Sequence, residues 1–208
     1  DHLTKAYNRR YMMDSLSREK ARADRVGSTF SLCIFDLDYF KRVNDGLGHA
    51  VGDELLIEVA RRLTKLLREE DTAARLGGDE FTILLPDLKE IEVAAKFAER
   101  VLERLRTPIK IQGKEFFITG SLGIALYPDD GDIVDTLLKN ADIAMYHAKH
   151  SQRRFAFYES HLEESTKEDR SLERDLRDAI ENISEAFVLW DADNRLVMCN
   201  GKYQQFHN

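Results

Sequence analysis

Cysteine is scarce in this sequence of 208 residues, which contains only Cys33 and Cys199. Neither suggests a disulfide framework or a cysteine metal cluster, so a reducing compartment fits. Long apolar stretches are also missing: none approaches the roughly 20 residues that cross a bilayer, and no signal peptide is visible. We therefore expect a cytoplasmic segment that makes no membrane contact of its own.

An excess of basic residues is absent too. The chain has 31 Lys and Arg against 38 Asp and Glu, which gives a net charge of −7 at pH 7. This balance argues against a binder of nucleic-acid polymers, although a mononucleotide site can be locally positive in an acidic protein. A length of 208 residues is enough for one substantial domain and an appendage, and a composition of 43% hydrophobic and 33% charged residues indicates a soluble globular chain.

Residues 75–85 predict a β-hairpin with two consecutive carboxylates near its tip. Gly77-Gly78 supplies the positive φ angles of a tight two-residue turn, and alternating apolar residues follow it. Asp79 and Glu80 come directly after this predicted turn. Adjacent like charges there repel one another unless a cation or water screens them. A cation site and a merely solvated tip are both open interpretations of these residues alone.

A second acidic element favours the cation site. The apolar run 30–35 predicts a buried strand that ends at Asp36, where a carboxylate is costly without a partner. If this strand pairs with the hairpin, Asp36 and Asp79 converge. Such oxygen ligands suit Mg²⁺, which completes its shell with water and phosphate, and the nearby Lys41 suits polyphosphate charge.

Helical and strand patterns are mixed along the chain. Helices are expected over 11–23, 40–45, 51–69, 91–105 and 133–150. Besides the hairpin, strands are expected over 29–36, 108–112, 114–127 and 154–158. This order predicts an α+β fold with a central, mostly antiparallel sheet flanked by helices.

Gly77-Gly78-Asp79-Glu80-Phe81 is the signature of the GGDEF family of diguanylate cyclases, and the chain resembles that family over residues 1–159. Segments 1–10, 35–53 and 141–149 match in the same order. The resemblance implies the palm-like GGDEF fold of nucleotidyl cyclases. It also implies that two GTP molecules are joined into cyclic di-GMP with release of two pyrophosphates. Since one domain holds one GTP, turnover would need a homodimer.

The resemblance assigns roles to individual residues. Asp36, the backbone carbonyl of Leu37, and Asp79 would ligate Mg²⁺, with Mn²⁺ as an alternative metal. Asp79 would also accept the proton and Lys41 would stabilise phosphate charge, while Glu80 would either support a second metal or solvate the tip. Contacts to GTP are implied for Tyr39 and Phe40 through backbone amides at the phosphates, for Asn44 and Asp53 at guanine, and for Lys149 and Arg153 at the phosphates.

Four of these assignments depend almost wholly on the family. Taken alone, Asn44, Asp53, Lys149 and Arg153 would be interpreted as helix-end or solvated residues. The family often continues after the lysine with Gly-Arg-Asn, whereas this chain has Gln152-Arg153-Arg154. The missing glycine and asparagine put the backbone around Arg153 in question.

Arg68 and Asp71 lie before Gly77 at the spacing of the family's Arg-x-x-Asp product-inhibition site. A guanidinium fits phosphate and a guanine edge, and a carboxylate accepts guanine N–H groups. This similarity predicts that cyclic di-GMP binds here and inhibits turnover. The alternative is a helix C-terminal arginine with solvated acids.

After residue 159 the composition changes. Residues 160–183 predict a charged connector helix, and 184–208 resemble the opening hairpin of a PAS sensor domain. We expect the chain to be part of a larger protein whose other segments could include a membrane anchor.

The first alternative function is a catalytically silent GGDEF domain that binds GTP or cyclic di-GMP as a regulator, although the intact motif argues against it. The second is a structural dimerisation module.

Overall fold

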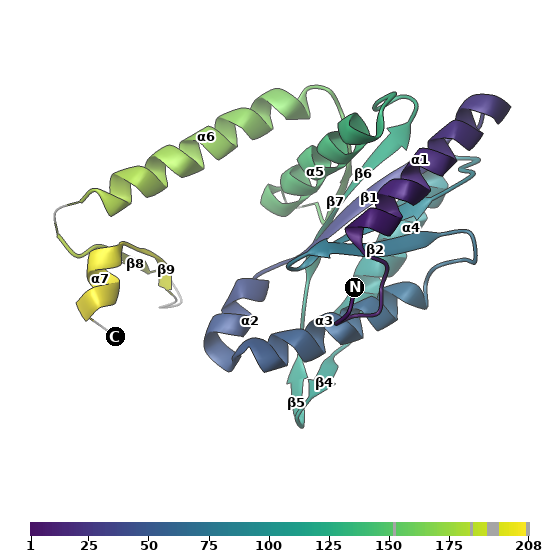
Figure 1. Ribbon diagram of the computed structural model, residues 1–208. Coiled ribbons are helices and arrows are strands. Elements are labelled where there is room, and N and C mark those ends of the chain that lie inside the picture. The colour runs from purple at the N-terminus through teal and green to yellow at the C-terminus, as the bar shows by residue number, and fades with distance from the viewer. Residues whose placement is uncertain (152, 184, 191–195, 207–208) are drawn as a thin grey trace. The chain divides into compact units, whose positions relative to one another are not determined.

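The structure is a computed structural model, and it describes residues 1–151, 153–183, 185–190 and 196–206 (Figure 1). The chain divides into two compact units, Asp1–Glu163 and Glu164–Asn208. The first unit holds every residue to which the sequence assigned a role in chemistry or ligand binding.

A five-stranded sheet forms the centre of the first unit, with strand order β2-β3-β1-β6-β7. Neighbouring strands are antiparallel except for β6 and β7. All eight residues of the central β1 are buried, which explains why its sequence is an almost continuous apolar run. The predicted α+β fold with a mostly antiparallel sheet is confirmed. The strands are β1 (Phe30–Leu37), β2 (Thr72–Gly77), β3 (Glu80–Leu85), β6 (Gly120–Tyr127) and β7 (Phe155–Phe157).

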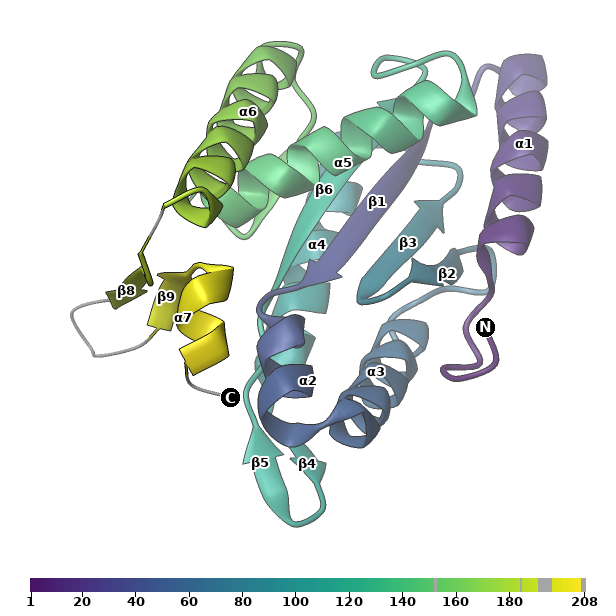
Figure 2. The same ribbon diagram turned by 60° about the vertical axis from the view of Figure 1, so that its left-hand side comes forward.

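Helices cover both faces of the sheet, because successive strand residues point to opposite sides. Cys33 and Phe35 of β1 belong to the core with α3 and α4, whereas Leu32 and Ile34 belong to the core with α1 and α5. Figure 2 shows α5 crossing one face while α4 lies behind the other. The helices of this unit are α1 (Arg9–Val26), α2 (Phe40–Leu47), α3 (His49–Thr64), α4 (Ile91–Arg106) and α5 (Val134–His150).

Two predicted elements differ from the structure. The helix predicted over 51–69 is α3, which ends at Thr64; a tighter turn follows, in which the Leu66 N–H donates to the Leu63 carbonyl at 2.9 Å. The strand predicted over 114–127 is two strands. Of these, β5 (Lys114–Phe116) pairs with β4 (Ile109–Ile111) in a separate hairpin, and β6 joins the main sheet. The strand-forming residues at 116–119 (Phe-Phe-Ile-Thr) conceal this change of sheet.

Helix α5 lies directly on β6 at Gly123. A Cβ atom on this glycine would lie 2.1 Å from both the Ala141 carbonyl oxygen and the Met145 backbone nitrogen. Since both atoms belong to the backbone of α5, no side-chain movement could make room. The missing side chain therefore sets the distance between the helix and the sheet.

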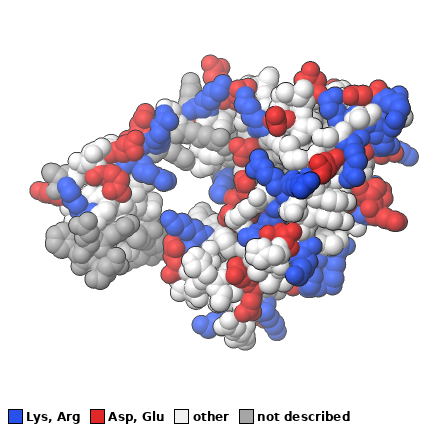
Figure 3. Space-filling model, viewed as in Figure 1, with Lys and Arg blue, Asp and Glu red and all other residues white. Residues whose placement is uncertain are grey.

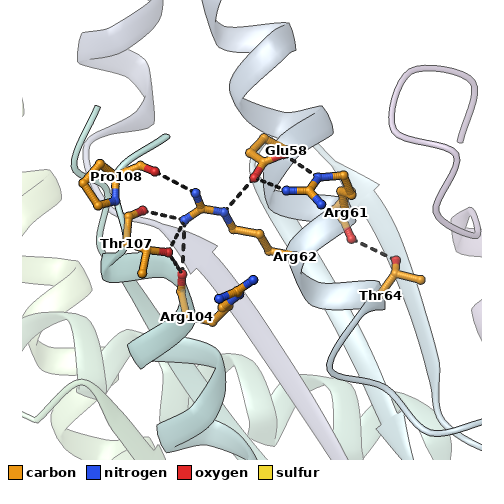
Figure 4. Close-up of polar contacts among 8 residues, drawn as sticks. Glu58, Arg61, Arg62, Thr64, Arg104, Thr107 and Pro108 are labelled. Carbon is orange, nitrogen blue, oxygen red and sulfur yellow. Dashed lines mark hydrogen bonds and ion pairs between the residues drawn. The ribbon is translucent and has the colours of Figure 1, made fainter. Parts of the chain in front are cut away.

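A buried arginine joins α3 to the end of α4 and the start of β4 (Figure 4). The Arg62 guanidinium donates to three main-chain carbonyls, those of Arg104, Thr107 and Pro108, at 3.1, 2.5 and 2.9 Å. It also donates to the Glu58 carboxylate at 2.8 Å. The last carbonyls of a helix have no partner within that helix, so Arg62 satisfies groups that α4 cannot.

The second unit contains most of α6 (Leu162–Glu181), a two-stranded hairpin and a short helix. β8 (Val188–Trp190) pairs with β9 (Leu196–Cys199), and α7 (Gly201–Phe206) follows. The Asn200 side chain accepts from the Phe187 N–H at 2.9 Å and donates to the Glu185 carbonyl at 2.8 Å. The centre of the predicted hairpin turn, at 191–195, lies outside the described residues.

The surface carries charges of both signs. On the face seen in Figure 3, acidic and basic side chains are interspersed. Within the part of the chain that the structure describes, no helix combines the length and the apolar character needed to cross a membrane.

Candidate active site

The acidic hairpin pairs with the central strand, which is the condition under which the sequence analysis expects Asp36 and Asp79 to converge. β3 is antiparallel to β1, with Glu80 opposite Asp36. The predicted turn is wrong by one residue: β2 continues through Gly77, β3 begins at Glu80, and the turn residues are Gly78 and Asp79. A register irregularity between Arg75 and Gly77 causes the shift, and both glycines have positive φ, 156° and 54°. Asp79 therefore lies at the tip, while Glu80 lies in the strand.

Asp36 is a buried carboxylate with a cationic partner. The Lys149 ammonium, from the last turn of α5, donates to its Oδ2 atom. Burial raises the pKa of Asp36, and Lys149 offsets part of that rise. Burial lowers the pKa of Lys149, but the ion pair with Asp36 outweighs this effect and the net pKa is raised. The structure thus brings together two predicted site residues that are far apart in sequence.

Glu80 faces the same side of the sheet as Asp36. The pKa of Glu80 is raised, first by burial and then by the charges of Asp142, Asp36 and Asp79. Asp142 and Lys149 are seven residues apart on α5, about two helical turns, so both lie along one face of the helix. The sequence analysis assigned no role to Asp142, because only its spacing before Lys149 links it to the site.

Asp38 also belongs to this acidic end of the sheet. It follows the last residue of β1 and accepts a hydrogen bond from the Ser121 hydroxyl at 2.9 Å. Its charge raises the pKa of Asp36 further. Several carboxylates thus lie close enough to influence one another, and the charge of Lys149 opposes only part of their repulsion.

A divalent cation suits this arrangement. The predicted ligands are two carboxylates, Asp36 and Asp79, and the Leu37 carbonyl. Mg²⁺ commonly binds one or two protein carboxylates and takes its other ligands from water and phosphate. No group of three or more His, Cys, Asp or Glu side chains in the described ranges could hold a metal ion. The two predicted carboxylates and the carbonyl would leave the remaining positions of a Mg²⁺ shell to water or phosphate.

Arg75 holds the turn that carries Asp79. Its guanidinium donates to the Gly78 carbonyl at 2.9 Å and forms an ion pair with Asp1 at 3.2 Å. Asp1 in turn accepts from the backbone and hydroxyl of Thr4, at 2.8 and 2.9 Å. The sequence assigned no role to Arg75, because nothing in the residue pattern tells a structural strand arginine from a solvated one.

Four of the six residues predicted to contact GTP lie on and around α2 and α3. Tyr39 has a left-handed backbone (φ 60°) and immediately precedes α2, whose N-terminal amides favour anions. Phe40 is buried, whereas Lys41 is exposed at the helix start. Asn44 lies near the end of α2, and Asp53 lies in the first part of α3.

Arg153 is exposed beyond the end of α5. Its backbone N–H donates to the Ser151 hydroxyl at 3.3 Å. Its side chain lines a cavity of about 980 Å³ together with Arg154, Phe155 and Phe157. The pair formed by Asp36 and Lys149 does not line this cavity, so the structure does not join Arg153 to them. The neighbouring Gln152 lies outside the described residues.

Arg68 and Asp71 form a tight turn after α3. The Asp71 carboxylate accepts from the Arg68 backbone N–H at 2.8 Å, and burial raises the pKa of Asp71. Both residues line a small cavity of about 30 Å³ with Arg100 of α4, whose guanidinium donates to the Leu66 carbonyl at 3.0 Å. Arg100 was missed because it is distant in sequence and typical of an exposed helix face.

The fold is an α+β domain with an acidic end of its sheet, and comparisons with known proteins identify the domain further. The family model described as "Diguanylate cyclase, GGDEF domain" matches residues 1–154. The chain belongs to the GGDEF family.

Relatives of known function or structure support this family assignment. The bifunctional diguanylate cyclase/cyclic di-GMP phosphodiesterase MucR of Pseudomonas aeruginosa is 45% identical over 182 residues, which are 87% of this chain and 26% of MucR. The crystal structure of the GGDEF domain of TpbB from the same species has a TM-score of 0.73 at 38% identity, and the match covers 75% of this chain and 98% of that one.

A third similar protein was crystallised with a ligand. The GGDEF domain of DgcB from Caulobacter crescentus, crystallised in complex with c-di-GMP, has a TM-score of 0.71 at 31% identity, covering 77% of this chain and 93% of that one. This chain spans about a quarter of the length of MucR. The activity of a whole protein containing this chain is therefore a matter for proposal.

Proposed function

We propose that this domain is a diguanylate cyclase, which condenses two GTP molecules into cyclic di-GMP and two pyrophosphates across a homodimer. The observation that carries the proposal is the convergence of Asp36, Asp79 and Glu80 at one end of the sheet. There the pKa values of Asp36 and Glu80 are raised, first by burial and further by the charges of neighbouring carboxylates. Such a cluster favours binding of a cation together with polyphosphate.

Each 3′-hydroxyl would attack the α-phosphate of the other GTP, and the bond to pyrophosphate would break. Asp79 would accept the hydroxyl proton. Lys41 and Lys149 would hold phosphate oxygens, with Arg153 as a further contact, and the amides of Tyr39 and Phe40 would orient them. The bound Mg²⁺ or Mn²⁺ would neutralise charge on the phosphates. The domain's own contribution is mainly positioning, as in other phosphoryl transfers.

Lys149 would change partners when substrate binds. In the structure its ammonium contacts Asp36, the proposed metal ligand. A cation at Asp36 would weaken this ion pair and free the ammonium for a phosphate oxygen. The exchange keeps a positive charge beside Asp36 both with and without substrate.

We further propose that cyclic di-GMP binds at Arg68 and Asp71 and inhibits turnover. The support is the Arg-x-x-Asp spacing, together with Arg100 on the same small cavity. The three side chains would offer two guanidinium groups for phosphate or a guanine edge and one carboxylate for guanine N–H groups.

The segment 184–208 would form the start of a PAS-like sensor after the connector helix.

The decisive experiment measures cyclic di-GMP formation from GTP and Mg²⁺ over a range of protein concentrations. We expect specific activity to rise with concentration, because two domains complete one site. The Asp79→Ala variant should lose at least ~100-fold in rate, as for removal of a general base. Added cyclic di-GMP should inhibit the unaltered chain, and Arg68→Ala should release that inhibition.

Two results would contradict the proposal. GTP binding without product at any concentration, even when a fused coiled coil forces dimerisation, would indicate a regulatory GGDEF domain instead. An Arg68→Ala variant with unchanged product affinity and unchanged feedback would remove the product site from the proposal and leave the cyclase in place.

A further inference from the structure

Helices α2 and α3 approach each other closely at Gly52. This glycine is buried in the first part of α3, and a Cβ atom on it would lie 2.0 Å from Asn44 Oδ1 and 3.2 Å from Phe40 Cζ. Both distances are shorter than ordinary van der Waals contact. The Asn44 side chain therefore occupies the space that any other residue at position 52 would need for its own side chain.

This contact fixes where the Asn44 amide lies. Asn44 and Gly52 belong to different helices, and Gly48, with a positive φ of 86°, turns the chain between them. The Gly48 N–H also donates to the Asn44 carbonyl at 2.9 Å, which closes α2. The amide consequently rests on the backbone of α3 next to Asp53.

We propose that Gly52 is a positioning residue that determines base specificity, because its missing side chain leaves room for the Asn44 amide on the backbone of α3, directly before Asp53 in the chain. An amide and a carboxylate together match the carbonyl and N–H groups on the edge of guanine. This inference rests on the proposed function, together with the guanine contacts that the family resemblance implies for Asn44 and Asp53. It adds Gly52 as the residue that keeps the Asn44 amide close to Asp53.

The geometry separates this role from ordinary packing. The atoms nearest to a new Cβ belong to the end of the Asn44 side chain, which can rotate away, and Phe40 would need to yield by only a few tenths of an ångström. Alanine is also the better helix former. Gly52→Ala should therefore fold, with the amide displaced. A pure packing role would instead lower stability and weaken all nucleotides equally.

The chain supplies a matched control. Gly46 lies in α2, is also helical, and has no atom within 4 Å of the position that a Cβ would take. Gly46→Ala therefore makes the same chemical change in a helix without touching Asn44. The test compares the full chain with Gly52→Ala, Gly46→Ala, Asn44→Ala and the Asn44→Ala/Gly52→Ala double variant.

Binding is measured by calorimetry with Mg²⁺ and 3′-deoxy-GTP or 3′-deoxy-ATP, which lack the attacking hydroxyl. We expect Gly52→Ala to weaken 3′-deoxy-GTP by about 10-fold, the scale of one lost hydrogen bond, while 3′-deoxy-ATP changes less than about 2-fold. Gly46→Ala should match the unaltered chain. The double variant should bind no more weakly than Asn44→Ala, because Gly52 acts through Asn44.

Two outcomes would overturn the inference alone: an equal loss for both nucleotides, or a double variant whose loss is the sum of the single losses. An unaltered chain that binds 3′-deoxy-GTP no better than 3′-deoxy-ATP would overturn the proposed function, and this inference with it. The two failures are therefore distinguishable in one set of titrations.

Discussion

Glu80 is held near other carboxylates by the pairing of β1 with β3. Burial and the charges of Asp142, Asp36 and Asp79 raise its pKa. A carboxyl group whose pKa is raised in the folded state favours folding when protonated. In metal-free protein its contribution to stability is therefore complete below the ordinary pKa of 4.5 and is lost as the pH rises through the raised value.

Glu80→Gln should accordingly stabilise the metal-free chain at neutral pH. We expect the melting temperature at pH 7 in the presence of a chelator to rise by roughly 2–4 °C, which corresponds to about 1 kcal/mol. The gain should shrink as the pH approaches 4.5, because Glu80 of the unaltered chain is then protonated. Differential scanning calorimetry across this range measures it.

Glu69→Gln is the control, since Glu69 is an exposed residue in the turn after α3. The same loss of charge there should leave the melting temperature nearly unchanged. A Glu80→Gln variant that melts at or below the temperature of the unaltered chain at pH 7 would mean that Glu80 is not under repulsion in the folded protein.

At the scale of elements, Arg62 connects α3, α4 and β4. Its side chain is 8% exposed, whereas that of Arg61, which also contacts Glu58, is 50% exposed. Arg62→Met should lower the free energy of unfolding by about 3 kcal/mol, because buried carbonyls lose their donors. Arg61→Met should cost less than about 1 kcal/mol. Urea unfolding of both variants measures the difference, and equal costs would contradict the structural role of Arg62.

The acid stability of this connection follows from Glu58. Hydrogen bonding to Arg61, opposed by burial and assisted by Arg62, lowers the pKa of Glu58 to about 2. A lowered carboxyl pKa stabilises the fold above the ordinary value of 4.5, and this stabilisation is lost as the pH falls toward 2. Lowering the pH therefore removes the stabilisation contributed by Glu58 beside Arg62, whereas it relieves the destabilisation at Glu80.

Most elements could be predicted because their patterns are local. The apolar run of β1 and the alternating residues of β3 indicated strands, and both are present. The turn at Gly78 and Asp79 could not be placed to the residue, because an irregularity in β2 is set by strand pairing. Likewise, residues 116–119 have strand propensity although they precede β6, and only the pairing with β1 shows where β6 begins.

The candidate site was predictable to the extent that motif residues carry it. Asp36, Asp79 and Glu80 lie together because their strands pair as expected, and the contact between Lys149 and Asp36 joins residues that the family resemblance had already selected. Arg75 and Asp142 were not predicted, because their relevance depends on which helix and which turn lie beside them. Such neighbours are a property of tertiary packing.

At the scale of the whole molecule, all proposed site residues lie in the unit Asp1–Glu163. We predict that a chain truncated after Glu163 keeps its fold, because the sheet and both cores are complete within it. Its affinity for 3′-deoxy-GTP should remain within about 2-fold of that of the full chain, measured by the same titration with Mg²⁺.

Comparison of cyclic di-GMP formation by the two chains then isolates the second unit. A lower rate at equal concentration, with unchanged nucleotide affinity, would assign residues 164–208 to assembly of the dimer. Loss of nucleotide affinity in the truncated chain would contradict the prediction that the first unit is self-sufficient.

The close approach of α5 to β6 at Gly123 has a consequence for how mutational data on this protein should be interpreted. All nineteen alternatives at this position add at least one carbon atom where the helix backbone already lies. In a saturation library selected for activity, every substitution at Gly123 should therefore be depleted, as strongly as substitutions at Asp36. A depletion map alone would place Gly123 among the ligand-binding residues. Only an abundance measurement in parallel would separate the two positions, because Asp36 variants would persist in the cell while Gly123 variants would disappear.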